Sequence, residues 1–179
     1  MKKPFVMSEI ARWFDRQFTS RHPPELHPNL RCRLAGTAPR MEEEFRGLSE
    51  AAASQRFADT WSVKRNAVHL HLLEPLWDLR LDDFLAGREV LSPADLTNRA
   101  TEESLADDLS LEEIAANFRR SRAAALERLD GLQLTDFARS ALHPRLKTPM
   151  TLVDLMAFVA EHDDHHLARI RELKRLLGA

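Results

Sequence analysis

Several residue types are scarce in this 179-residue sequence, and each scarcity excludes a class of protein. Cys32 is the only cysteine, so the chain cannot form an intrachain disulfide or a secreted disulfide framework. Tyrosine is absent and glycine occurs 5 times, which disfavours a turn-rich β fold. No run reaches the ~20 apolar residues of a membrane span, and the start MKKPFVMSEIARWF lacks the apolar stretch of a signal peptide. We therefore expect a cytoplasmic protein that does not bind membranes.

The charge balance argues against a nucleic-acid partner. The 26 basic and 28 acidic residues give a net charge of −2, whereas a nucleic-acid-binding surface needs a basic excess. The length fits one domain over residues 1–179. The expected partner is a small-molecule substrate, and association into a homodimer stays open.

Helical periodicity runs through most of the chain. It predicts helices over about residues 5–18, 30–48, 62–84, 111–132 and 151–177, separated by long loops at 87–109 and 133–150. Gly36 and Pro39 are expected to kink or delay the second helix, and Pro75 to bend the third. The pattern predicts an all-α protein, a four-helix bundle with long crossover loops and an N-terminal helical extension (residues 1–22) packed on it. Metal sites in such bundles are built from side chains that project inward.

The last predicted helix carries two histidines on its apolar face. His162 and His166 continue the apolar spacing of three and four residues between Val159 and Ile170. They lie one turn apart, and an i, i+4 histidine pair can bind one metal ion, as in the HExxH zinc helix. With 8 histidines in the chain such a pair can also arise by chance, but imidazoles in an apolar stripe need partners, which a metal ion would supply. His165 lies off the centre of the stripe and is left out of the predicted site.

The predicted helix over residues 62–84 supplies a third candidate ligand. His69 shares a face with Leu73 and Leu76 that is expected to point inward, whereas His71 lies about 160° away on the face expected to meet solvent. Three histidines would leave a tetrahedral metal ion one open position, which is typical of catalytic sites. Zinc is the first choice, and nickel, cobalt, manganese and iron also accept imidazole ligands.

Three motifs, taken in order, resemble the DinB/YfiT-like family of metalloenzymes. They are Trp61-Ser62-Val63-Lys64 followed by His69-Leu70, then His143-Pro144 with the segment 150–155, then Glu161-His162-Asp163-Asp164-His165-His166-Leu167. The resemblance covers the chain from about residue 24 to 176. It implies an unusual four-helix bundle and metal ligands at His69, His162 and His166. It also implies a link to transferases and isomerases that use low-molecular-weight thiols.

Two arginines depart from the pattern of the family that the chain resembles. Arg65 stands where an acidic residue is frequent and Arg169 where glutamine is common. Arg65 could bind an anionic substrate or lie at the end of the bundle with its guanidinium in water. Arg80 shares the inner face of His69 three turns on and is expected to form a structural ion pair rather than to clamp a substrate. Cys32 is expected to be a small buried hydrophobe.

The remaining polar and aromatic candidates are expected to have structural roles. Trp61 and Trp77 are predicted as core residues rather than as a platform for a ligand. His143 is predicted as a capping or packing residue of its loop, with lining of the pocket as the lesser alternative. Three carboxylates could accept a hydrogen bond from a ligating histidine but are expected to be solvated: Glu161, Asp163 and Asp164.

Two classes of function follow from such a site. In an enzyme, the open position of the metal would bind a low-molecular-weight thiol as a thiolate for transfer to an electrophile, or bind water with a pKa near ~7 and give a hydrolase. A non-enzymatic, stress-related metal-binding bundle would instead show a fourth protein ligand or no pocket at the metal.

Overall fold

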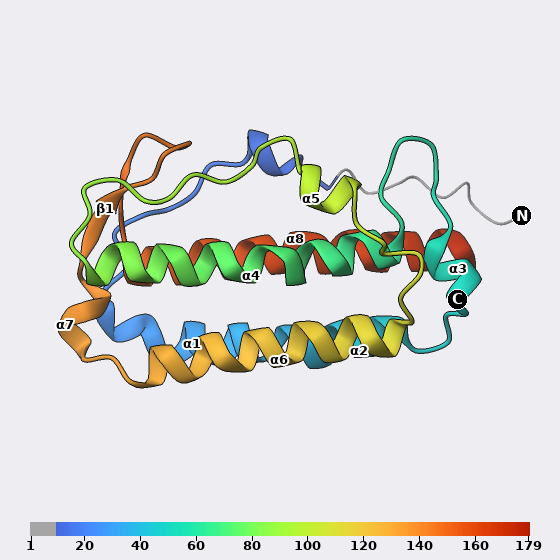
Figure 1. Ribbon diagram of the computed structural model, residues 1–179, viewed down its shortest axis with the longest axis horizontal. Helices are drawn as coiled ribbons and strands as arrows, with labels where there is room; N and C mark the ends of the chain where they lie inside the picture. The colour runs from blue at the N-terminus through green and yellow to red at the C-terminus, as the bar shows by residue number, and fades with distance from the viewer. Residues whose placement is uncertain (1–9) are drawn as a thin grey trace, which may run out of the picture.

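The computed structural model describes residues 10–179 of the chain. Three long helices and one divided helix form a bundle: α4 (Val63–Leu85), α6 (Leu111–Asp130), α8 (Leu152–Leu177), and α1 (His27–Ala35) followed end to end by α2 (Thr37–Phe45). Helices α4 and α8 pack side by side in one layer, and α6 packs beside α1 and α2 in the other (Figure 1). The protein is therefore the all-helical four-helix bundle that the sequence predicts.

Short elements fill the connections. They are the 3-10 turns Trp13–Asp15 and Pro24–Leu26, the helical turns α3 (Glu50–Ser54), α5 (Arg99–Glu102) and α7 (Leu134–Phe137), and the strands β1 (Ser140–Leu142) and β2 (Pro149–Thr151). The two strands pair antiparallel, with Ser140 opposite Thr151. This hairpin lies at one end of the bundle, within the connection predicted to be a loop (Figure 1).

The long helices begin where side chains cap them. The Ser62 side chain accepts a hydrogen bond from the Arg65 N–H at the start of α4. Capping boxes begin the other two, formed by Ser110 with Glu113 on α6 and by Thr151 with Asp154 on α8. These caps satisfy backbone N–H groups that the first helical turn leaves without partners. Helix α4 continues through Pro75.

The predicted first two helices differ most from the structure. The part of the 5–18 prediction that lies before residue 10 is outside the described residues, and the rest forms one 3-10 turn rather than an α-helix. Its apolar residues instead pack on α8, where the ring of Trp13 lies 5.1 Å from that of Phe158. The predicted 30–48 helix starts earlier, divides at Gly36 and ends before Gly47, whose φ of 81° suits glycine.

A polar layer divides the apolar core of the bundle into two clusters. The bundle has four rods: α4, α6, α8, and α1 together with α2. Each rod contributes residues to both clusters. In the layer between the two clusters, each rod contributes one member of a buried polar network: Thr37, Glu74, Arg122 and Asp163. Arg122 binds Glu74 and Asp163, each with a closest N–O distance of 2.6 Å, and the Thr37 hydroxyl donates to Asp163 at 2.7 Å. The layer joins α2, α4, α6 and α8 at the same height. None of the described helices combines the length and apolar character that a membrane crossing requires.

Candidate metal centre

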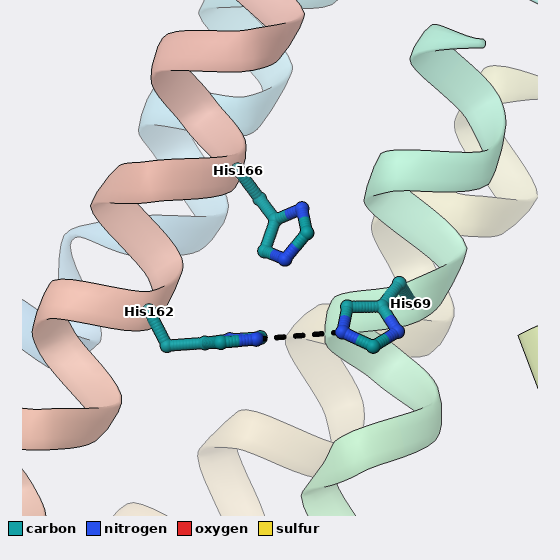
Figure 2. A group of neighbouring side chains, drawn as sticks. All are labelled: His69, His162 and His166. Carbon is teal, nitrogen blue, oxygen red and sulfur yellow. Dashed lines mark hydrogen bonds between the residues drawn. The ribbon is translucent and has the colours of Figure 1, made fainter. Parts of the chain in front are cut away.

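The structure brings together the three predicted histidines. His162 and His166 lie one turn apart on α8, and His69 faces them from α4, with all three side chains at most 7% exposed. Figure 2 shows the three rings converging on a common point between the two helices. One nitrogen from each ring lies within 4.8 Å of the other two, and the Nε2 atoms of His69 and His162 are 3.4 Å apart.

An amide from α4 orients His166. The Asn66 Nδ2 group donates to the Ser62 carbonyl at 2.9 Å, which leaves its Oδ1 as the atom facing the imidazole. His166 Nδ1 lies 2.9 Å from that oxygen and must carry a hydrogen to donate to it. The Nε2 of His166 therefore presents a lone pair toward the other two rings, as a metal ligand does.

A residue from the connection between α4 and α6 orients His69. The Thr101 hydroxyl, on α5, lies 2.8 Å from His69 Nδ1, and Thr101 is itself buried. No pattern in the sequence predicts this contact, because Thr101 is 32 positions away in a segment expected to be an irregular loop. His162 Nδ1 is buried and has no hydrogen-bond partner among residues 10–179.

Burial keeps the three imidazoles neutral. It lowers the pKa of His69 to about 4, and it lowers the pKa values of His162 and His166 well below the ordinary value, with the neighbouring imidazoles adding to the effect. Neutral rings offer lone pairs without first losing a proton. Two ligand nitrogens on a tetrahedral zinc ion would be ~3.3 Å apart, given zinc–nitrogen distances of ~2.05 Å. The separation of the His69 and His162 Nε2 atoms, 3.4 Å, fits such an ion.

The histidines open into a cleft of about 840 Å³. Helices α4 and α8 form its floor, and its walls come from the four segments 12–14, 57–61, 93–98 and 143–145. None of the described lining residues belongs to α1, α2 or α6. The cleft therefore lies on the outer side of the α4–α8 layer, where the connecting segments cross over it (Figure 1).

The position of the cleft corrects the prediction that the site faces the core of the bundle. Helix α8 buries both of its broad faces, one against α1 and α2 and the other beneath the connecting segments. An apolar stripe therefore does not tell which of these two faces the histidines occupy. The same correction applies to α4, where His71 is half-buried with its Nδ1 3.1 Å from the Ser121 hydroxyl of α6, rather than facing solvent.

All 3 tryptophans of the chain line the cleft. The ring of Trp61 lies 4.8 Å from that of His69, and the ring of Trp13 meets His162 edge-on at 4.9 Å. Trp61 and Trp77, predicted as core residues, are half-buried and line the cleft, and Trp77 also packs against the apolar core. Trp13 was predicted only as part of a docked helix.

Other predicted roles change once contacts are seen. Cys32 is exposed rather than buried, because it lies on the outer side of α1. Arg65 pairs with Glu102 and Asp107, which uses its charge within the protein. Arg80 is buried as expected, but its contacts are the Ser92 carbonyl and the His143 ring, and no ion pair involves it among residues 10–179.

The acidic neighbours of the α8 histidines do not contact the site. Asp163 is held in the polar layer of the core, and Glu161 and Asp164 both pair with Arg33 of α1. His165 lines the cleft outside the cluster of three, in line with its omission from the predicted site. His143 caps its loop as predicted, since its Nδ1 accepts from the backbone N–H groups of residues 145 and 146, and it also lines the cleft.

Comparison with known families places this fold. The family profile described as DinB superfamily matches residues 33–170. The chain belongs to the DinB superfamily. Among solved structures it is similar to YfiT from Bacillus subtilis, described as a probable metal-dependent hydrolase with an unusual four-helix bundle topology. The TM-score is 0.77 at 19% sequence identity, over 91% of this chain and 94% of that one. The curated proteins include no significant match.

This member of the DinB superfamily has two features that a closed structural site would lack. The cluster contains three potential ligands from the described part of the chain, with no fourth side chain from His, Cys, Asp or Glu. A cleft large enough for a small molecule leads to it. A metal ion held by these three histidines would therefore keep an accessible position.

Proposed function

We propose that the protein is an enzyme that holds one divalent transition metal ion, zinc in the first instance, with His69, His162 and His166. We further propose that it transfers a low-molecular-weight thiol to an electrophilic small molecule. The observation that supports this most directly is the convergence of three neutral, buried imidazoles on the floor of an open cleft. Such a site suits zinc or nickel, and the imidazole set does not by itself select between them.

Different residues of the chain would bind the metal ion, orient its ligands and exclude water. The three histidines would bind the ion, while Asn66 and Thr101 fix the orientation of two of the rings. The ion would supply stabilisation of a thiolate at neutral pH. The walls around the site are rich in aromatic side chains, which exclude water from the reacting sulfur. The thiol would lose its proton to solvent before it reacts. Its sulfur would then bond to the electrophilic carbon and displace a leaving group such as halide, which departs with the electrons of the broken bond.

The position of Asp163 favours a thiol over water as the nucleophile. In an HExxH zinc helix the residue after the first histidine is a glutamate that serves as general base. Here that position is Asp163, which is fully buried and bound to Arg122 at 2.6 Å and to the Thr37 hydroxyl. It faces the bundle core and cannot act as a base in the cleft. An ionised thiol needs no such base, because it has already lost its proton.

A metal-dependent hydrolase is the second candidate, because the structurally similar YfiT is described as a probable one. The two candidates differ in their requirement for a thiol. We expect conjugation of a small electrophile such as a halogenated nitrobenzene only with an added thiol, and loss of turnover on chelation. Hydrolysis of nitrophenyl esters at an undiminished rate without any thiol would support the hydrolase instead.

Metal content tests the site on which both candidates depend. We expect about one equivalent of transition metal in the wild-type protein and a large loss in His166→Ala, because the remaining two ligands bind weakly. The matched control is His165→Ala, which removes a neighbouring imidazole that lies outside the cluster. Elemental analysis of the three proteins, purified identically, measures this. Equal metal content in wild type and His166→Ala would refute the metal centre.

A further inference from the structure

The cleft has a second polar end that the proposed chemistry does not use. It is formed by Arg80 on α4 with His143 and Arg145 from the β1–β2 connection, all of which line the same cleft as the three histidines. Arg80 is eleven residues after His69 on one helix. At a rise of 1.5 Å per residue, it lies ~16 Å farther along the cleft floor.

Two hydrogen-bond donors face each other at this end. His143 Nδ1 accepts from the backbone N–H groups of Arg145 and Leu146 at 3.2 and 3.1 Å, so it cannot carry a hydrogen. The neutral ring must then carry its hydrogen on Nε2. That atom lies 3.3 Å from Nη1 of Arg80, and a guanidinium has only donors. Both side chains are 2% exposed, so water contributes little to resolving the conflict. A ligand with a hydrogen-bond acceptor placed between the His143 Nε2–H and the Arg80 guanidinium would satisfy both donors.

Neither Arg80 nor Arg145 forms an ion pair among the described residues, although the charge of the buried Asp83 acts to raise the pKa of Arg80. Asp83, three residues after Arg80 on α4, is bound to the Arg88 side chain and accepts from the Ser92 backbone N–H. Arg145 forms no ion pair in residues 10–179, and its Nη2 is buried without a hydrogen-bond partner there. Burial lowers the pKa of Arg80 to about 10, which reflects the cost of holding this charge out of water. A buried guanidinium beside a second, half-buried one, with no ion pair to either, is costly for a protein to keep.

We propose that Arg80, His143 and Arg145 bind the carboxylate of a small molecule that lies along the cleft. Two arginines can take both oxygens of a carboxylate, and the Nε2–H of His143 can donate to one of them. Between this end and the histidines the floor and walls are apolar, formed by Leu76, Trp77 and Phe158 among others. The ligand would therefore have an anionic end and an apolar middle. As an extension that rests on the proposed function, its opposite end would carry the electrophile that reaches the metal centre.

The carboxylate site can be tested without the metal. All 3 tryptophans line the cleft, and the Arg80 guanidinium lies 5.4 Å from the Trp77 ring, so intrinsic fluorescence reports on ligand binding there. The probes are octanoate and its uncharged match octanamide, titrated into metal-free protein so that the acid cannot bind a metal ion. We expect octanoate to bind on the order of 10- to 100-fold more tightly than octanamide, the value of charge-assisted hydrogen bonds.

Substitutions assign the preference to the named residues. Arg145→Met and Arg80→Met should each remove most of the preference for the acid. Arg99→Met should keep it, because Arg99 is exposed outside the cleft and pairs with Glu103. If Arg80→Met does not fold because Arg80 is buried, the preference measured in Arg145→Met alone tests the proposal. Equal affinity for octanoate and octanamide, or an unchanged preference in Arg145→Met, would overturn the proposal.

His166→Ala separates this proposal from the proposed function. The variant should keep its preference for octanoate while it loses metal. A protein that binds metal but shows no preference for the acid would refute the carboxylate site alone. A protein that prefers the acid but binds no metal would refute the metal centre alone.

Discussion

At the scale of single residues, the hydrogen bonds behind the histidines decide how well they can bind a metal. Asn66 has its amide fixed by the Ser62 carbonyl and thereby sets the tautomer of His166. Thr101 faces His69 with a hydroxyl, which can either donate or accept. The two contacts are of similar length, but only the Asn66 contact requires one tautomer of its histidine ring.

Removal of these contacts should lower the affinity for metal without abolishing metal binding. We expect Asn66→Ala to lower metal affinity by ~10- to 100-fold, the usual cost of losing a partner behind a ligating histidine. Thr101→Val should cost less, because the hydroxyl does not force one tautomer. Competition with a chelator of known affinity measures both, with His165→Ala as the control. Unchanged affinity in Asn66→Ala would show that the amide plays no part.

Burial of neutral histidines should make the metal-free protein sensitive to acid. The pKa of His69 is about 4 when folded and near ~6.5 when unfolded, so between these values the unfolded chain binds more protons. Stability from this source is fully present above pH ~6.5 and is lost as the pH falls toward 4, by about 3 kcal/mol for His69. Urea unfolding of metal-free protein at pH 7.5 and pH 5 measures the loss. His69→Asn should lose less over the same interval, and an equal loss would contradict this assignment.

The residues of the site were predictable to different degrees. His162 and His166 were found because they interrupt an apolar stripe at its own spacing, and His69 because it shares a face with leucines on the neighbouring helix. Asn66, three positions before His69, could have been found as a polar residue on a helix that buries both sides. Thr101 could not, because no periodicity relates a loop residue to a helix 32 positions away.

At the scale of elements, the strongest constraint on the bundle is the polar layer. Arg122 of α6 bonds both Glu74 of α4 and Asp163 of α8, and it donates to the Leu34 carbonyl of α1 at 3.2 Å. Burial raises the pKa of Glu74, while the charge of Arg122 acts in the opposite direction. The network therefore fixes the relative height of four helical segments at some cost in desolvation.

Breaking this layer at Arg122 should strongly destabilise the fold. Arg122→Met leaves two buried carboxylates without a cationic partner, and we expect the free energy of unfolding to fall by about 3–5 kcal/mol. Combining Arg122→Met with Glu74→Leu and Asp163→Leu should recover much of this loss, because no unpaired charge then remains. Urea denaturation of the single and triple variants measures both. A triple variant as unstable as the single one would show that packing, not charge, holds the layer.

The limits of prediction at this scale follow from element length. The three long helices were located to within a few residues because each has several turns of periodicity and a capping side chain. The hairpin strands have 3 residues each, too few for an alternating pattern to show. Residues 10–18 form one 3-10 turn although apolar residues occur there at helical spacing, and Trp13 and Phe18 contact Phe158 from this part of the chain.

At the scale of the whole molecule, different parts of the chain form the bundle and the walls of the cleft. The four rods pack around the divided core, and the connecting segments pack on the outer side of α4 and α8 to enclose the cleft (Figure 1). The site therefore takes its ligands from the rigid helices and its walls from the connections. Changes in the walls should alter access to the metal centre while leaving the bundle intact.

Trp13 offers the clearest test of that separation. Its ring covers His162 edge-on from a segment outside the bundle, so Trp13→Ala should open a path from solvent to the histidines. We expect chelators to extract the metal several-fold faster, with little change in the far-ultraviolet circular dichroism spectrum, because the helices remain packed. Leu105→Ala, at a side chain that is 72% exposed and away from the cleft lining, is the matched control. If Trp13→Ala releases metal no faster than the control, the N-terminal segment does not limit access, and entry to the metal centre must lie between the other walls of the cleft.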